Sequence, residues 1–145
     1  MDHQLTLENF EATVQAQQRP YVIQFFSTTC GPCQTMKPVI EKLRAENDSL
    51  NVFTVNTNEE PEISAHFGIR SVPTIHVCEG REILYSFHGV TPFRDLQFVL
   101  ENIDDIHFRT TGEFKRDNEK KDYTFSLIVI GLLAIFIGLF VFLPK

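Results

Sequence analysis

Basic residues are scarce in this sequence of 145 residues, in which 13 lysines and arginines stand against 19 aspartates and glutamates. An acidic chain does not attract the phosphates of nucleic acids, so we expect no nucleic-acid binding. The same balance gives no support for electrostatic adhesion to a membrane surface. The N-terminus, MDHQLTLENF, is polar and acidic and lacks the apolar stretch that defines a signal peptide.

Charged residues are absent from residues 123–143, which contain the apolar run SLIVIGLLAIFIGLFVFL. About 20 such residues suffice to cross a hydrocarbon core of roughly 30 Å. A domain of this size cannot cover the run on every side as a buried helix. We therefore expect residues 123–145 to form a C-terminal transmembrane anchor. Gly131, Ala134 and Gly138 share one face of this helix, which would suit the helix–helix contact of a homodimer.

The orientation of the anchor follows from its flanks, because basic flanks stay on the cytoplasmic side of a membrane. Four basic residues precede the apolar run and one follows it: Lys115, Arg116, Lys120 and Lys121, and then Lys145. The sequence therefore predicts a single-pass membrane protein whose N-terminal domain faces the cytoplasm.

Cysteine is also scarce, and two of the three cysteines, Cys30 and Cys33, are separated by two residues in FFSTTCGPCQTMKP. In a reducing cytoplasm such a pair is more often catalytic or metal-binding than a structural disulfide. A zinc site usually needs four ligands. The other candidates have no ligand spacing, so we expect no metal: Cys78, His3, His66, His76, His88 and His107. We expect Cys78 to be a buried core thiol, and His76 and His88 to be core or surface residues.

The order of predicted elements indicates an α/β fold. Apolar spacing predicts a helix from Leu7, and dense β-branched and aromatic runs predict strands at 21–26 and 51–56. Further segments are predicted as a helix from Cys33, a short helix at 59–68, a hairpin at 74–89 and a helix at 91–103. Thr91 is expected to cap this last helix, with Pro92 at its first position. Residues 104–122 read as a charged linker.

These features together resemble the thioredoxin family. The resemblance is carried by CGPC after a strand, Pro38 inside the following helix, FGIRSVPT at 67–74, and Gly89 after the hairpin. It covers roughly residues 5–105 and implies a three-layer sandwich with a mixed sheet, here residues 1–103. It also implies a redox-active disulfide between Cys30 and Cys33, and a cis Val72–Pro73 bond that faces them.

The chemistry of the pair can be argued from the start of a helix. Free N–H groups and the helix dipole there favour a thiolate, so Cys30 is expected to be the nucleophile. Cys33, one turn further in, is expected to resolve the mixed disulfide. Gly31 would let the backbone turn tightly, and Pro32 suits a first helical turn. Exchange between thiols and disulfides requires no cofactor.

Val72 and Pro73, together with Thr29 and Gly89, are the expected substrate groove. Val72 can offer backbone groups to an extended substrate, and Pro73 removes an N–H from the approach to Cys30. Thr29 stands where the family usually has tryptophan, which this chain lacks altogether.

Two further departures concern the buried site beneath the cysteines. Gln24 takes the place of a buried aspartate, and Thr54 that of its lysine partner. Neither replacement carries charge. We expect disulfide exchange to survive with a slower or differently pH-dependent resolving step.

The sequence thus predicts a membrane-tethered protein-disulfide reductase that acts on protein disulfides, those of membrane proteins among them. A reductase or a small thiol would supply its electrons. Two alternatives stay open: a non-catalytic binding or assembly module in a membrane complex, and an outward-facing disulfide oxidase or isomerase.

Overall fold

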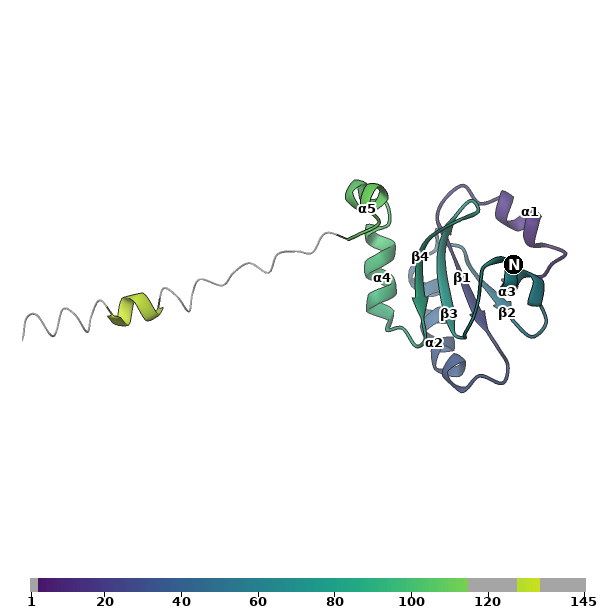
Figure 1. The fold of residues 1–145 in the computed structure, drawn as a ribbon, viewed down its shortest axis with the longest axis horizontal. Helices are drawn as coiled ribbons and strands as arrows, with labels where there is room; N and C mark the ends of the chain where they lie inside the picture. Colours follow the sequence, from purple (N-terminus) through teal and green to yellow (C-terminus); the bar gives the residue numbers. More distant parts are fainter. Residues whose placement is uncertain (1–2, 115–127, 134–145) are drawn as a thin grey trace, which may run out of the picture. The chain divides into compact units, whose positions relative to one another are not determined.

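The fold is taken from a computed structural model that describes residues 3–114 and 128–133 (Figure 1). The chain divides into two units, Met1–Glu113 and Phe114–Lys145. Among the described residues, no helix has the length and hydrophobicity needed to cross a membrane. The expected anchor at residues 123–145 lies mostly outside them, as do Ala134 and Gly138, while residues 128–133 are helical.

A mixed four-stranded sheet forms the centre of the first unit, as the resemblance implied. Its strands are β2 (Val52–Asn56), β1 (Tyr21–Phe26), β3 (Thr74–Glu79) and β4 (Glu82–His88), in that spatial order. β1 runs parallel to β2 and antiparallel to β3, and β3 and β4 form the predicted hairpin. A parallel pair needs a crossover, and this one is made by the helix between β1 and β2.

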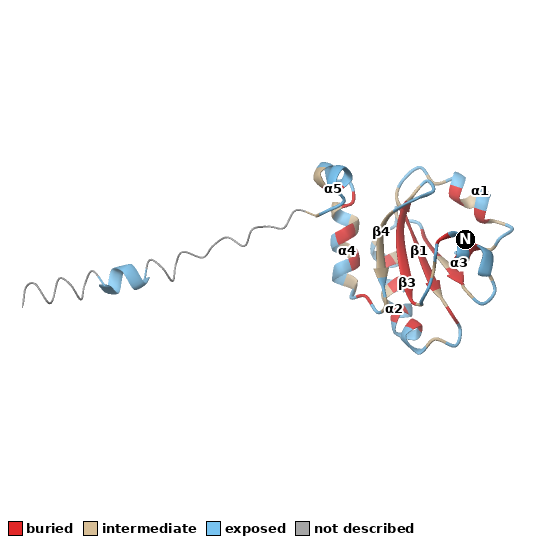
Figure 2. Cartoon of the chain, in the orientation of Figure 1, coloured by how far each residue is buried: buried red, intermediate tan, exposed pale blue. Residues whose placement is uncertain are grey.

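Helices cover both faces of the sheet (Figure 1). Helices α1 (Phe10–Gln15) and α3 (Pro61–His66) lie over one face, and α2 (Gly31–Glu46) and α4 (Phe93–Asn102) over the other. Because both faces are covered, β1 and β3 are buried almost throughout, as Figure 2 shows. The polar residues of these strands, Gln24, Thr74 and His76, are therefore buried together with the apolar ones.

The start of α4 differs from the prediction. Pro92, with an extended backbone, is the N-cap residue, and the helix begins at Phe93. Thr91 instead donates its N–H to the sulfur of Met36 at 3.2 Å, and its hydroxyl donates to the carbonyl of Gly89. The loop before α4 is therefore tied to α2 rather than folded into a threonine cap.

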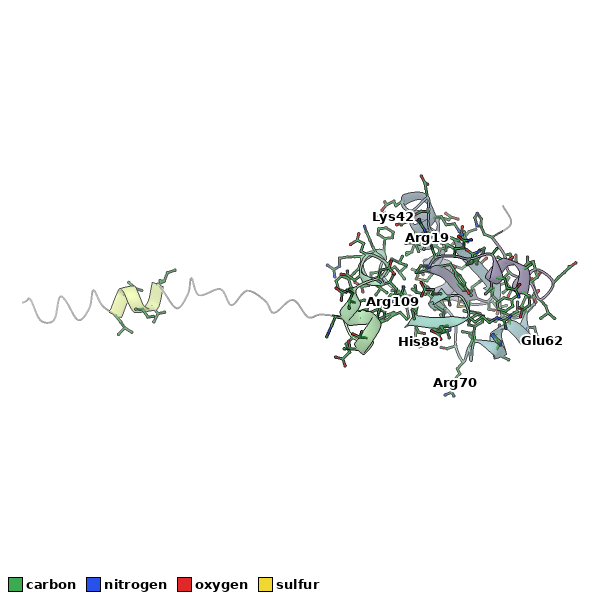
Figure 3. All side chains as sticks on the ribbon, turned by 90° about the horizontal axis from the view of Figure 1, so that it is seen from above. Arg19, Lys42, Glu62, Arg70, His88 and Arg109 are labelled. Carbon is green, nitrogen blue, oxygen red and sulfur yellow. A yellow bond between two sulfur atoms is a disulfide. The ribbon has the colours of Figure 1, made fainter. Side chains whose placement is uncertain are left out.

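A fifth helix, α5 (Ile106–Thr111), occupies residues that we expected to be linker. Asp105 caps it by accepting from the N–H groups of His107 and Phe108, and Gly112 ends it with a φ of 74°. Phe108 is 4% exposed. Arg109, which is labelled in Figure 3, pairs with Glu79 of β3 and with Asp104. The first compact unit therefore continues past Ile103 to Glu113.

Candidate functional site

Cys30 and Cys33 form a disulfide at the start of α2, with their Cα atoms 5.3 Å apart. Cys30 is the N-cap residue, and its sulfur accepts the N–H of Cys33 at 3.2 Å. Cys33 is 5% exposed, whereas Cys30 is half-buried. The two sulfurs therefore differ in access to solvent, and the outer one lies where free backbone N–H groups gather.

The chain reaches this position through a short turn after β1. The buried Ser27 accepts the N–H of Cys30 on its carbonyl at 3.2 Å, and its hydroxyl lies 3.0 Å from that of Thr29. Pro32 sits in the first helical turn, as predicted. We expected Gly31 to allow a tight backbone turn, and this reason was wrong. The φ of Gly31 is not in the left-handed region, and a Cβ at this position would meet open space.

The loop before β3 faces the disulfide. The Val72–Pro73 bond is cis, the isomer that the resemblance implied. The carbonyl oxygen of Val72 lies 3.7 Å from the sulfur of Cys30. Gly89, with a φ of 82°, donates its N–H to the carbonyl of Pro73 at 2.8 Å. A side chain at position 89 would be strained, so glycine allows the end of β4 to reach this loop.

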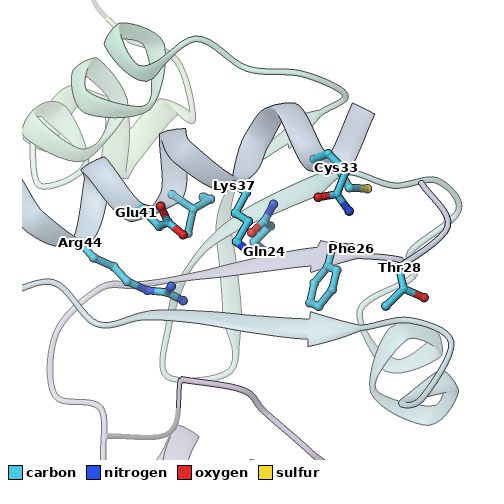
Figure 4. Close-up of a pocket in the computed structure, with 9 residues that line it drawn as sticks. Gln24, Phe26, Thr28, Cys33, Lys37, Glu41 and Arg44 are labelled. Carbon is cyan, nitrogen blue, oxygen red and sulfur yellow. The ribbon is translucent and has the colours of Figure 1, made fainter. Parts of the chain in front are cut away.

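Gln24 lies beneath the disulfide. It is 5% exposed and faces Thr54 across the parallel pair of β1 and β2. Gln24 and Cys33 line a cavity of about 300 Å³ between α2 and β1 (Figure 4). Thr54 does not line this cavity. The structure therefore brings Gln24, but not Thr54, to the inner cysteine.

The same cavity is lined by charged residues that the sequence analysis did not single out: Lys37, Glu41 and Arg44, all from α2. Arg44 donates two N–H groups to the carbonyl of Val52, and burial lowers its pKa from the usual value. The available signal was the spacing of four residues between Cys33 and Lys37, which places both on one helical face.

The candidates Cys78, His76 and His88 lie on β3 and β4. Cys78 is free and fully buried in β3, and burial raises its pKa to about 12. The expectation of a buried core thiol is therefore confirmed. His76 is also buried; its Nδ1 lies 2.8 Å from the hydroxyl of Ser86, and burial lowers its pKa. His88 is exposed (Figure 3). No group of three or more potential metal ligands comes together in the described part of the chain.

A Cys-X-X-Cys disulfide at a helix start, opposite a cis-proline loop, is a site for exchange between thiols and disulfides. The family model Thioredoxin matches residues 2–102. A thioredoxin of Alicyclobacillus acidocaldarius is 33% identical over 100 residues, which are 68% of this chain and 94% of that protein. Thioredoxin 1 of a Nostoc species is 30% identical over 99 residues, or 68% and 92% of the two chains.

This chain belongs to the thioredoxin family, and it is a thiol-disulfide oxidoreductase of the disulfide-reductase type. The matched residues end at 102, before α5 and before the apolar run at residues 123–143. The family therefore accounts for the disulfide and its surroundings. The family match does not extend to the C-terminal third of the chain.

Proposed function

We propose that this protein is a membrane-tethered protein-disulfide reductase in which Cys30 attacks and Cys33 resolves. The thiolate of Cys30 attacks one sulfur of a substrate disulfide, and the first substrate thiolate leaves. The thiolate of Cys33 then attacks the sulfur of Cys30, and the second substrate thiolate leaves. The substrate disulfide gains two electrons and two protons, and the Cys30–Cys33 disulfide remains.

The observation that carries these roles is the different burial of the two sulfurs at one helix start. Cys30 is half-buried and serves as N-cap, whereas Cys33 is 5% exposed. A substrate sulfur can approach Cys30 from solvent but cannot approach Cys33 in the same way. The N–H of Cys33, 3.2 Å from the sulfur of Cys30, would stabilise a thiolate there.

The loop that carries Val72 would hold the substrate. The carbonyl oxygen of Val72 lies 3.7 Å from the sulfur of Cys30. An extended segment of the substrate that pairs with this backbone would therefore bring the substrate disulfide to the nucleophile. Pro73 offers no N–H at this point, and Thr29 presents a small hydroxyl beside Cys30 instead of a large ring. This geometry favours substrates whose disulfide lies in an extended, locally unfolded segment.

The tether is supported by the sequence, because residues 123–143 carry no charge and the basic residues gather before them. The reductase domain would then face the cytoplasm, where a reductase or a small thiol returns electrons to the disulfide. Its substrates would be protein disulfides within reach of the membrane. Protection of the domain from added protease in intact cells tests its cytoplasmic location. Resistance of the chain to extraction from membranes by alkali tests the tether.

Reduction of insulin disulfides tests the chemistry. The full-length chain should reduce insulin, Cys30→Ser should have no activity, and Cys33→Ser should accumulate a mixed disulfide through Cys30. Cys78→Ser, which changes a thiol outside the site, is the matched control and should stay active. An inactive parent chain that still binds unfolded proteins would favour the binding or assembly module instead.

A further inference from the structure

Lys37 is a charged residue placed next to the inner cysteine. It follows Cys33 by four residues in α2, and residues at this spacing share one face of a helix. Side chains of a helix generally lean toward its N-terminus, which is the direction in which Cys33 lies from Lys37. Lys37, Cys33 and Gln24 line the same cavity, and Figure 4 shows Lys37 descending from α2 toward Gln24 on β1.

The charges around this cavity come from one wall only. α2 supplies Lys37, Glu41 and Arg44, whereas the residues from β1 and the loop after it are neutral: Gln24, Phe26 and Thr28. Along the helix axis Lys37 lies about 6 Å from Cys33, Glu41 about 12 Å and Arg44 about 16 Å, at about 1.5 Å per residue. Among the described residues that line the cavity, Lys37 is therefore the charge nearest to Cys33.

Lys37 is also uncommitted within the described part of the chain. Ion pairs there involve Lys42, Arg81, Arg94 and Arg109, but not Lys37. Arg44, the other cation at the cavity, is turned toward the carbonyl of Val52. The Lys37 side chain is exposed, so the cavity also has contact with solvent.

We propose that Lys37 assists the resolving step by stabilising the thiolate of Cys33. This inference rests on the proposed function. The positive charge near Cys33 would come from Lys37 of α2, because the residues of β1 at the cavity are neutral. In the mixed disulfide, Cys33 gives its proton to solvent in the cavity, and Lys37 keeps its own proton throughout. The Cys33 sulfur then bonds to Cys30, the bond from Cys30 to the substrate breaks, and the substrate thiolate leaves with the electron pair and takes a proton from solvent.

The test uses full-length Cys30→Ser protein, in which the ultraviolet absorbance of the thiolate follows the ionisation of Cys33. Cys78 does not interfere below strongly alkaline pH, because burial raises its pKa to about 12. Adding Lys37→Gln should move the midpoint of the Cys33 titration upward by about 0.5–1 pH unit at low salt. Lys37→Arg should restore the parent midpoint.

Lys42→Gln is the matched control, because Lys42 lies on the same helix, half-exposed at the surface and outside the cavity (Figure 3). It should leave the midpoint unchanged, and the Lys37 effect should shrink in about 1 M salt, where screening acts over roughly 3 Å. An unchanged midpoint in Lys37→Gln, or an equal shift in Lys42→Gln, would overturn the proposal. The titration needs no substrate disulfide, so failure to reduce insulin would count against the proposed function alone.

Discussion

Cys30 and Cys78 are the same residue type in two regions of one domain, and the regions give their sulfurs opposite chemistry. Cys30 caps α2, half-buried, and accepts an N–H from Cys33. Cys78 lies in β3, fully buried and free, paired in register with Tyr21 and Ile83 on the neighbouring strands. A helix start leaves N–H groups available to a thiolate, whereas a strand in the middle of a sheet uses them in its ladders.

The largest effect should come from removing the reactive member of this comparison. Cys30→Ser should reduce the rate of insulin reduction to background, because no other thiol in the domain is both accessible and placed at free N–H groups. Cys78→Ser should keep the rate within about two-fold while lowering the free energy of unfolding by about 1–2 kcal/mol, since a buried hydroxyl replaces a thiol. Loss of the rate in Cys78→Ser with the fold intact would erase the distinction between the two regions.

The second effect concerns charge beneath the cysteines. Gln24→Asp should lower the free energy of unfolding by about 2–4 kcal/mol, because a carboxylate would be buried at a 5% exposed position. Gln24→Met, which is similar in length and uncharged, serves as the control and should cost less. The penalty should grow in a Lys37→Gln background, since Lys37 lines the same cavity. Chemical denaturation at neutral pH measures the free energy of unfolding of Gln24→Asp, Gln24→Met, Lys37→Gln and the double variant Gln24→Asp, Lys37→Gln. Equal stability of Gln24→Asp and Gln24→Met would contradict the buried placement of Gln24.

A smaller effect should come from His76 in β3. Burial favours the neutral form of its ring, as it favours the neutral thiol of Cys78. Burial lowers the pKa of His76 below its ordinary value of 6.5, so the folded protein holds the neutral ring. The unfolded chain binds the extra proton, so this contribution to stability is fully present above about pH 6.5 and is lost as the pH falls below it.

His76→Gln should flatten the dependence of the unfolding free energy on pH as the pH falls below about 6.5. The parent chain, measured over the same pH range, is the reference. If His76→Gln keeps the parent slope, the acid sensitivity arises elsewhere in the domain.

The smallest effect on chemistry should come from removing the apolar tail. Deletion of residues 123–145 should leave insulin reduction within about two-fold, because the described site is built from residues of the first unit alone. Activity toward disulfides of membrane proteins should fall much further, since tethering raises their effective concentration. An unrelated membrane helix fused at the same point should restore it. Equal losses on both substrates would direct attention to the face of Gly131, Ala134 and Gly138.

Much of the fold could be predicted because its elements carry local signals, such as the β-branched and aromatic residues of β1 and the Glu79–Gly80 turn between β3 and β4. The disulfide was equally visible, since CGPC opens a helix directly after a strand. α5 was missed because six residues with one buried side chain, Phe108, give no periodic pattern. The signals for α5 in the sequence were the N-cap residue Asp105 and the terminating Gly112, but aspartate and glycine are common in linkers as well.

Lys37 was missed for a different reason. Its spacing from Cys33 is visible in the sequence, but a lysine on a helix is usually a solvated surface residue. Only the packing of α2 on β1 shows that Lys37 and Gln24 border one cavity with the inner cysteine. The uncharged Thr54 on β2 stands where the family usually has a lysine, whereas α2 places Lys37 at the cavity.

The most direct test of the central claim is the order in which the three thiols of the reduced, full-length chain are alkylated at neutral pH. Mass spectrometry of peptides after brief exposure to iodoacetamide reports each site separately. Cys30 should be modified first, Cys33 much more slowly, and Cys78 only after the protein is unfolded. Faster modification of Cys33 than of Cys30, or modification of Cys78 in the folded protein, would contradict the account.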